Sequence, residues 1–143
     1  MPCLTRVIPD LQRNGPLLEI YFSVPEKLEK ELVSNKKKVP DPVKCDALID
    51  TGASNCVIQQ DIPKKLGLSP VGEIAMTTPS CQSCKCYTYY LRMTILPQNI
   101  VYEGVFTAAP LMGQQIDCLV GRDLLSTCVL IYNGYMKQFT FSL

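Results

Sequence analysis

The stretch Asp50-Thr51-Gly52-Ala53-Ser54 decides the fold, because it places a carboxylate in a tight turn between two apolar segments. Residues 45–49 before it are mostly apolar and predict a buried strand, and residues 55–58 after it are apolar again. A carboxylate left between such segments costs free energy unless it is hydrogen-bonded or used in chemistry. Gly52 permits a close backbone approach that a side chain would block. The turn is therefore a candidate reactive site.

A second segment points the same way. Residues 116–120 form an apolar run that ends in Gly121-Arg122-Asp123 and leads into Leu124-Leu125. A strand–Asp-Thr-Gly–strand unit, followed by such a strand and a short helix, resembles the retropepsin-like aspartic proteases over residues 47–143 of this chain. In that family the Gly-Arg-Asp segment packs behind the catalytic loop. The resemblance therefore implies that Asp50 is the catalytic acid and that Gly121, Arg122 and Asp123 give structural support.

The order of short strands, turns and helices predicts a mainly β domain, namely a closed, barrel-like retropepsin fold with one or two short helices. The chain of 143 residues fits one domain spanning residues 1–143. Within it we expect an N-terminal strand plus a charged insertion over residues 1–44 and the catalytic core over residues 45–143. The charged residues 25–43 are expected to form one short solvated helix and a loop. Asp61 is expected to cap a short helix. Asn133-Gly134, between two apolar runs, predicts a closing hairpin.

Another hairpin is expected at about residues 73–96, with extended arms at 73–78 and 87–96 and a polar loop over 79–86. By its place in the order of elements it corresponds to the flap that closes over substrate in retropepsins. Its tip lacks the Gly-rich sequence of viral flaps. The flap candidates are Cys81, Cys84, Cys86 and Tyr87. In the run of residues 87–90, Tyr87 and Tyr89 are expected on one face of the strand and Tyr90 on the other. Packing and lining of the cleft are both open roles for these tyrosines.

The eight cysteines fall into two main groups. Cys45, Cys56, Cys118 and Cys128 lie in apolar runs and are interpreted as small buried thiols. The C-x2-C-x-C spacing of residues 81–86 fits part of a zinc site, but the chain has no histidine and a fourth thiol would have to come from elsewhere. We therefore expect no metal and no cofactor. A redox-sensitive loop is the alternative.

The composition excludes several functions. With 47% hydrophobic and 19% charged residues and a net charge of +1, nothing suggests nucleic acid or an anionic membrane as a partner. No apolar run reaches the roughly 18 residues of a membrane span. The first residues lack a basic-then-apolar signal layout, so we expect a cytoplasmic protein or a fragment of a longer one. The absence of histidine excludes Ser-His and Cys-His catalysis within the chain.

Aspartic protease chemistry needs two carboxylates that share one proton, and this chain has a single Asp-Thr-Gly. The second aspartate must then come from a second copy across a two-fold axis, so the chain is expected to be a homodimer acting on a polypeptide substrate. By resemblance, Thr51 hydrogen-bonds across the axis, Gly52 offers backbone groups to the substrate, and Ala53 packs beneath the loop. Residues 139–143 are a candidate interface strand.

One departure from the viral pattern concerns Arg122. In viral retropepsins this arginine pairs with an acid that directly follows Asp-Thr-Gly-Ala, and here that position is Ser54. Three acceptors are then open for Arg122: Asp123, a backbone carbonyl, or an acid across the interface.

Three functions compete. The first is a homodimeric aspartic endopeptidase. The second is a peptide-binding or dimerisation module that keeps the fold and cleaves poorly, because fold alone does not establish activity and Asp-X-Gly turns are also common structural turns. The third is a thiol-based redox or metal sensor that uses residues 81–86. The intact Asp50-Thr51-Gly52 favours the first.

Overall fold

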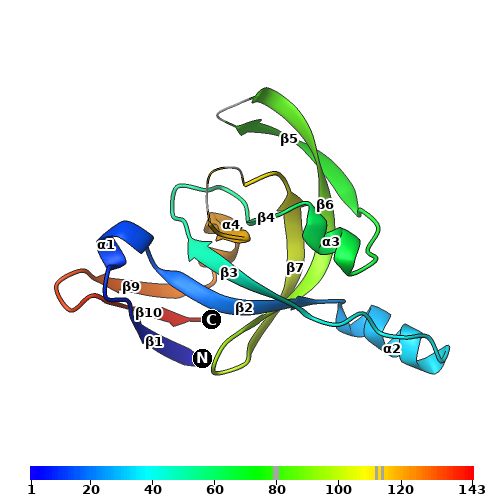
Figure 1. Cartoon of the computed structure of the whole chain (residues 1–143), viewed down its shortest axis with the longest axis horizontal. Coiled ribbons are helices and arrows are strands. Elements are labelled where there is room, and N and C mark those ends of the chain that lie inside the picture. The colour runs from blue at the N-terminus through cyan, green and yellow to red at the C-terminus, as the bar shows by residue number, and fades with distance from the viewer. Residues whose placement is uncertain (79–80, 112, 114) are drawn as a thin grey trace.

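The computed structural model of the chain describes residues 1–78, 81–111, 113 and 115–143, which form two sheets and four short helices (Figure 1). The strands are β1 (Cys3–Val7), β2 (Leu17–Ser23), β3 (Val43–Ile49), β4 (Val57–Ile58), β5 (Gly72–Thr78), β6 (Cys81–Ile95), β7 (Ile100–Ala108), β8 (Cys118–Val120), β9 (Val129–Asn133) and β10 (Gln138–Ser142). The helices are α1 (Leu11–Asn14), α2 (Glu26–Ser34), α3 (Asp61–Lys65) and α4 (Arg122–Leu125). The mainly β prediction is confirmed. The expectation of one or two helices is too low for the described residues.

The larger sheet closes on itself. Its strand order is β2-β3-β8-β4-β7-β6-β5, and β2 also pairs with β6, so the strands from β2 round to β6 form a ring. The ring encloses the core because side chains alternate in and out along each strand. Phe22 of β2 and Phe106 of β7 are fully buried and meet edge to face, with ring centroids 5.2 Å apart. This packed ring is the scaffold for the loops at its rim.

The smaller sheet joins both ends of the chain in the order β1-β10-β9. The strand β1 was not foreseen, because only Leu4 among its residues is buried and its pattern is short. β10 is the middle strand, with Phe139 and Phe141 buried in the core, so both of its edges are already paired within the chain. Edge pairing with a second copy is therefore available to β1 and β9 rather than to the predicted interface strand.

The closing hairpin between β9 and β10 forms where the sequence predicts it, but its turn is longer than the Asn-Gly pair suggests. Residues 134–137 make a four-residue loop, and the side chain of Asn133 accepts a hydrogen bond from the Met136 N–H at 3.0 Å. Lys137 takes the left-handed conformation, with φ 52°. The turn is thus built on an asparagine side chain rather than on a two-residue turn.

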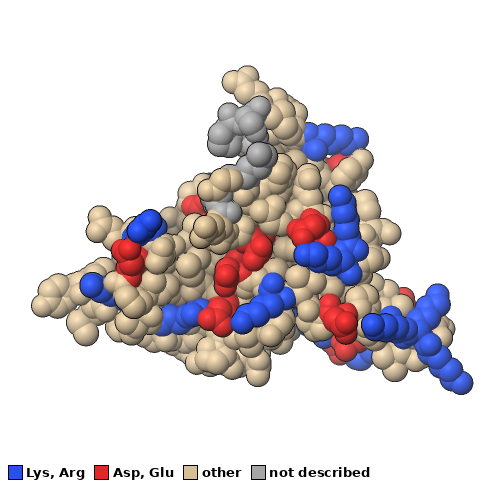
Figure 2. All heavy atoms as spheres, in the orientation of Figure 1, with Lys and Arg blue, Asp and Glu red and all other residues tan. Residues whose placement is uncertain are grey.

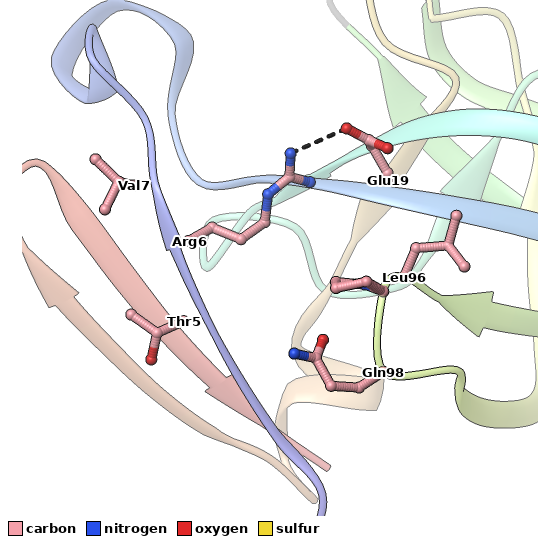
Figure 3. Close-up of a pocket in the computed structure, with 7 residues that line it drawn as sticks. Thr5, Arg6, Val7, Glu19, Leu96 and Gln98 are labelled. Carbon is pink, nitrogen blue, oxygen red and sulfur yellow. Dashed lines mark hydrogen bonds and ion pairs between the residues drawn. The ribbon is translucent and has the colours of Figure 1, made fainter.

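The two sheets are linked beside a surface groove of about 540 Å3 (Figure 3). Arg6 of β1 reaches across this groove to Glu19 of β2, with 3.1 Å between guanidinium nitrogen and carboxylate oxygen. A partly exposed pair of this kind contributes little to stability, on the order of 1 kcal/mol or less. The position of β1 is set mainly by its pairing with β10.

The charged insertion contains α2, as predicted, and this helix buries none of its residues. It is held to the ring by Arg92 of β6, which pairs with Glu29 at 2.8 Å and with Glu103 at 2.9 Å. Figure 2 shows that basic and acidic side chains are intermingled on the visible face, including over α2, so neither sign of charge dominates there. Asp61 is the first residue of α3 rather than its cap, and no side chain caps that helix.

The flap hairpin, here residues 72–88, is formed by β5 and the first part of β6 and extends beyond the ring (Figure 1). The predicted polar loop over 79–86 is wrong from Cys81 onward, because those residues belong to β6, while residues 79–80 lie outside the described residues. The register shifts between Met76 and Thr78, and Ser83 has a φ of 68°. An extra residue on β6 thus makes a β-bulge next to the hairpin tip.

Candidate active site

The Asp50 loop, residues 50–56, joins β3 to β4 over the end of β8. β8 lies between these two strands, parallel to β3 and antiparallel to β4. The N–H of Asp50 donates to the carbonyl oxygen of Val120 at 3.0 Å, which continues the β3–β8 pairing into the loop. Two segments far apart in the sequence therefore meet directly beneath the candidate catalytic carboxylate.

The Asp50 carboxylate is held by its own turn. Its Oδ1 atom accepts a hydrogen bond from the Gly52 N–H at 2.8 Å, and its carbonyl oxygen accepts one from the Ala53 N–H at 3.2 Å. A Cβ atom at Gly52 would lie 3.0 Å from Oδ1, closer than ordinary contact. Glycine is thus the residue that lets this N–H approach the acid, as the sequence suggested. Asp50 itself is half-buried.

Arg122 braces the Asp50 loop from the start of α4. Its Nη1 atom donates to the carbonyl oxygens of Thr51 at 2.9 Å and Gly52 at 3.1 Å, and its Nη2 atom donates to Ser54 Oγ at 3.0 Å. The sequence left three kinds of acceptor open for Arg122, and in the structure its acceptors include backbone carbonyls. Ser54 takes part through its hydroxyl and so replaces a charged partner with a neutral one.

Asp123 ties the same helix to the strand that leaves the loop. Its carboxylate accepts from the Cys56 N–H at 2.9 Å, from the Cys56 thiol at 3.0 Å and from the Leu124 N–H at 2.8 Å. The pKa of Cys56 is raised to about 12 by burial and by this hydrogen bond. Cys56 is therefore a neutral thiol that donates to Asp123.

Cys56 was interpreted from the sequence only as a buried thiol. It is buried, and its sulfur also accepts a hydrogen bond from the Gly121 N–H at 3.3 Å. Its role depends on Asp123, which lies far away in the sequence, so no local signal could have revealed it. Gly121 is needed at this junction, since a Cβ there would lie 2.4 Å from the carbonyl carbon of Asn55.

The other predicted buried thiols are placed as expected in two cases. Cys45 and Cys118 are buried in the ring, whereas Cys128 is only half-buried. Burial raises the pKa of Cys45 to about 12, and it raises the pKa of Cys118 well above 9.0. Cys45 and Cys118 are part of the core, and Cys128 packs against it.

The cysteines of the flap hairpin are not three free thiols of a polar loop. Cys81 and Cys84 form a disulfide with a Cα–Cα distance of 5.8 Å. Cys86 is buried in a small apolar cluster with Val57 and Ala109. Within the described residues, no group of three or more histidine, cysteine, aspartate or glutamate side chains could hold a metal ion.

The tyrosines of β6 point to two different places. Tyr87 and Tyr89 line a pocket of about 330 Å3 beside Lys64 of α3, whereas Tyr90 lines another pocket against α2. Tyr87 is half exposed. Alternation along the strand therefore separates the side chains as the sequence predicts, and Tyr87 faces α3.

The family model described as aspartyl protease matches residues 38–124, more than half of the chain. No curated protein matches the chain. A solved structure of a retropepsin-like aspartic protease from Rickettsia conorii is similar, with a TM-score of 0.50 and 15% sequence identity. The match covers 98% of this chain and 92% of that chain, and at this identity it shows the fold.

The described residues contain no helix long and apolar enough to cross a membrane.

Proposed function

Because the chain belongs to the aspartyl protease family and has a retropepsin-like fold, we propose that it is a homodimeric aspartic endopeptidase with Asp50 as its catalytic residue. The observation that carries this proposal is the Asp50 loop. Its carboxylate is oriented by the Gly52 N–H at 2.8 Å, in a half-buried position at the rim of the ring. The loop is braced from below by Arg122 and Asp123.

The reaction needs two such carboxylates in contact. Close like charges cannot both ionise cheaply, so the pair holds one proton near the working pH. The ionised carboxylate takes a proton from a water molecule while the water oxygen bonds to the peptide carbonyl carbon. The protonated carboxyl group donates to the carbonyl oxygen. Collapse of the tetrahedral intermediate then breaks the C–N bond, and the leaving nitrogen takes up a proton from the pair.

A second copy of the chain supplies the second carboxylate in this proposal. The sequence has one Asp-Thr-Gly, and Thr51, Gly52 and Ser54 are exposed next to Asp50. An exposed loop that carries the acid can meet its symmetry mate at a two-fold axis. In this arrangement Thr51 and Gly52 contact the partner loop and the substrate backbone, and the flap hairpin covers a bound polypeptide.

The proposal is tested by cleavage of a peptide library, with products identified by mass spectrometry. We expect the parent to cleave peptides and the Asp50→Asn variant to lose at least about a thousandfold in rate, since both carboxylates of each pair are gone. Asp46→Asn is the matched control, because it removes the same charge from an exposed position on β3. Retained cleavage by Asp50→Asn would contradict the proposal. A folded parent that cleaves nothing would favour the peptide-binding alternative.

A further inference from the structure

Backbone hydrogen bonds to the end of β4 hold both ends of the connection between β7 and β8. Where the connection leaves β7, the Ala109 N–H donates to the carbonyl oxygen of Ile58 at 3.0 Å. Where it returns to β8, the Gln59 N–H donates to the carbonyl oxygen of Asp117 at 2.9 Å. Gln59, the first residue after β4, therefore lies where the two ends of this connection come together.

The side chain of Gln59 makes a second set of contacts inside the connection. Its Oε1 atom accepts from the Leu111 N–H at 3.2 Å. Its Nε2 atom donates to the carbonyl oxygen of Leu111 at 3.4 Å and to that of Ile116 at 3.5 Å. The two donor contacts are long and individually weak. Together, one amide group supplies partners to backbone groups that are not part of any strand ladder.

The three hydrogen bonds of the Gln59 side chain are called the Gln59 clamp. Leu111 connects the Gln59 clamp to the candidate active site. It is half-buried and packs against the apolar cluster of Val57, Cys86 and Ala109. Val57 begins the strand that leaves the Asp50 loop, and Met76 and Cys84 of the flap hairpin pack against the same cluster. Leu111 thus lies where the flap hairpin, the strand after the Asp50 loop and the β7–β8 connection come together.

We propose that Gln59 is a positioning residue for peptide cleavage, because its side-chain amide fixes Leu111 in the apolar wall between the Asp50 loop and the flap hairpin. This inference rests on the proposed function. Gln59 acts through Leu111 and touches no reacting atom. A wall that contacts bound peptide equally in the ground state and in the transition state changes KM and leaves kcat nearly constant.

The test uses two substitutions that differ in the contacts they keep. Gln59→Met is close in size and loses every side-chain hydrogen bond, whereas Gln59→Glu keeps an acceptor for the Leu111 N–H and loses the donor. Gln60→Met is the control, because Gln60 is the exposed neighbour of Gln59. Each protein is assayed on one internally quenched peptide that the parent cleaves, and hydrogen exchange of the Leu111 amide is followed by NMR.

We expect Gln59→Met to raise KM by about tenfold with kcat within about threefold of the parent, and to speed exchange of the Leu111 amide by about tenfold or more. Gln59→Glu should hold Leu111 exchange within about threefold of the parent, because the acceptor is retained. Gln60→Met should match the parent in both measurements.

Unchanged exchange of Leu111 in Gln59→Met would overturn the clamp, and a loss confined to kcat would overturn its positioning role. If Gln59→Met does not fold, fast exchange of Leu111 in the folded Gln59→Glu protein would overturn it as well. The exchange measurement needs no cleavage. A parent that cleaves no peptide therefore counts against the proposed function, while the clamp is still decided by exchange.

Discussion

Asp123 accepts hydrogen bonds from both the backbone N–H and the thiol of Cys56, at 2.9 and 3.0 Å. This contact joins the helix after Gly121 to the strand after the Asp50 loop. Because Arg122 holds the loop itself, two consecutive side chains of α4 fix both the loop and its exit. The geometry of the candidate catalytic acid therefore depends on residues that lie far from it in sequence.

Removal of the Asp123 carboxylate should destabilise the fold more than removal of the Cys56 thiol. Asp123→Ala leaves the Cys56 N–H, the Cys56 thiol and the Leu124 N–H without their acceptor, and we expect a loss of about 2–3 kcal/mol. Cys56→Ala loses one hydrogen bond and one buried sulfur, at a cost of about 1–2 kcal/mol. Urea unfolding measures both, with Asp46→Ala as the exposed control. The reverse order of the two losses would contradict this account.

The buried thiols should make the protein sensitive to alkali. Burial is the largest cause that raises the pKa of Cys45 and Cys56 from 9.0 to about 12. Between about pH 9 and 12 the unfolded chain therefore binds fewer protons than the native chain, and the free energy of unfolding falls as pH rises. The Cys45→Ala variant should lose less stability than the parent between about pH 8 and 10.5 in urea unfolding. Equal losses of stability in the parent and the variant would show that Cys45 is not a protonated thiol in the native state.

Arg122 should be irreplaceable by lysine. Its two terminal nitrogens reach three acceptors in the Asp50 loop, and an ammonium group cannot span them. We expect Arg122→Lys to lower kcat by more than about tenfold while the far-ultraviolet circular dichroism spectrum is retained. Arg13→Lys, in the last turn of α1, is the matched control and should behave as the parent. Parent-like kcat in Arg122→Lys would mean that the brace is dispensable.

The disulfide of the flap hairpin should stabilise the pairing of β5 with the first residues of β6. It spans a bulge in which Ser83 has a φ of 68°, a backbone conformation that residues other than glycine rarely adopt. Two-electron reduction by dithiothreitol gives two thiols and oxidised reductant. We expect this treatment, or the double substitution Cys81→Ser with Cys84→Ser, to speed amide hydrogen exchange of residues 76–78 and 81–85 by about tenfold. Exchange in the ring strands should stay unchanged. If exchange in residues 76–78 and 81–85 is unaltered, the disulfide has no such role.

The sequence predicts those features that are local or carried by strong patterns. The Asp50 turn, the strand before Gly121 and the charged helix in residues 25–43 all follow from periodicity and turn chemistry. The strand β1 was missed because its stability comes from pairing with β10 at the other end of the chain. The acceptors of Arg122, the thiol contact of Cys56 and the amide clamp of Gln59 likewise depend on long-range pairing, which no local window contains.

The flap hairpin shows the same limit in its cysteines. The C-x2-C-x-C spacing suggests a metal or redox role, but whether Cys81 and Cys84 lie on the same face depends on the bulge at Ser83. A one-residue insertion in a strand exchanges its faces. Cys81 and Cys84 can therefore share a face and form the disulfide, whereas Cys86 is buried because it packs against Val57 and Ala109, which are distant in the sequence.

The central claim is that two copies of Asp50 form one active site, and mixing experiments test it most directly. Parent and Asp50→Asn chains are combined at a fixed total concentration and equilibrated, and peptide cleavage is measured as the parent fraction varies. If each site needs an aspartate from both copies, activity follows the square of the parent fraction, so an equal mixture retains about one quarter of the parent activity. A linear dependence, with about half of the activity at equal mixing, would show that each chain carries a complete site and would contradict the account.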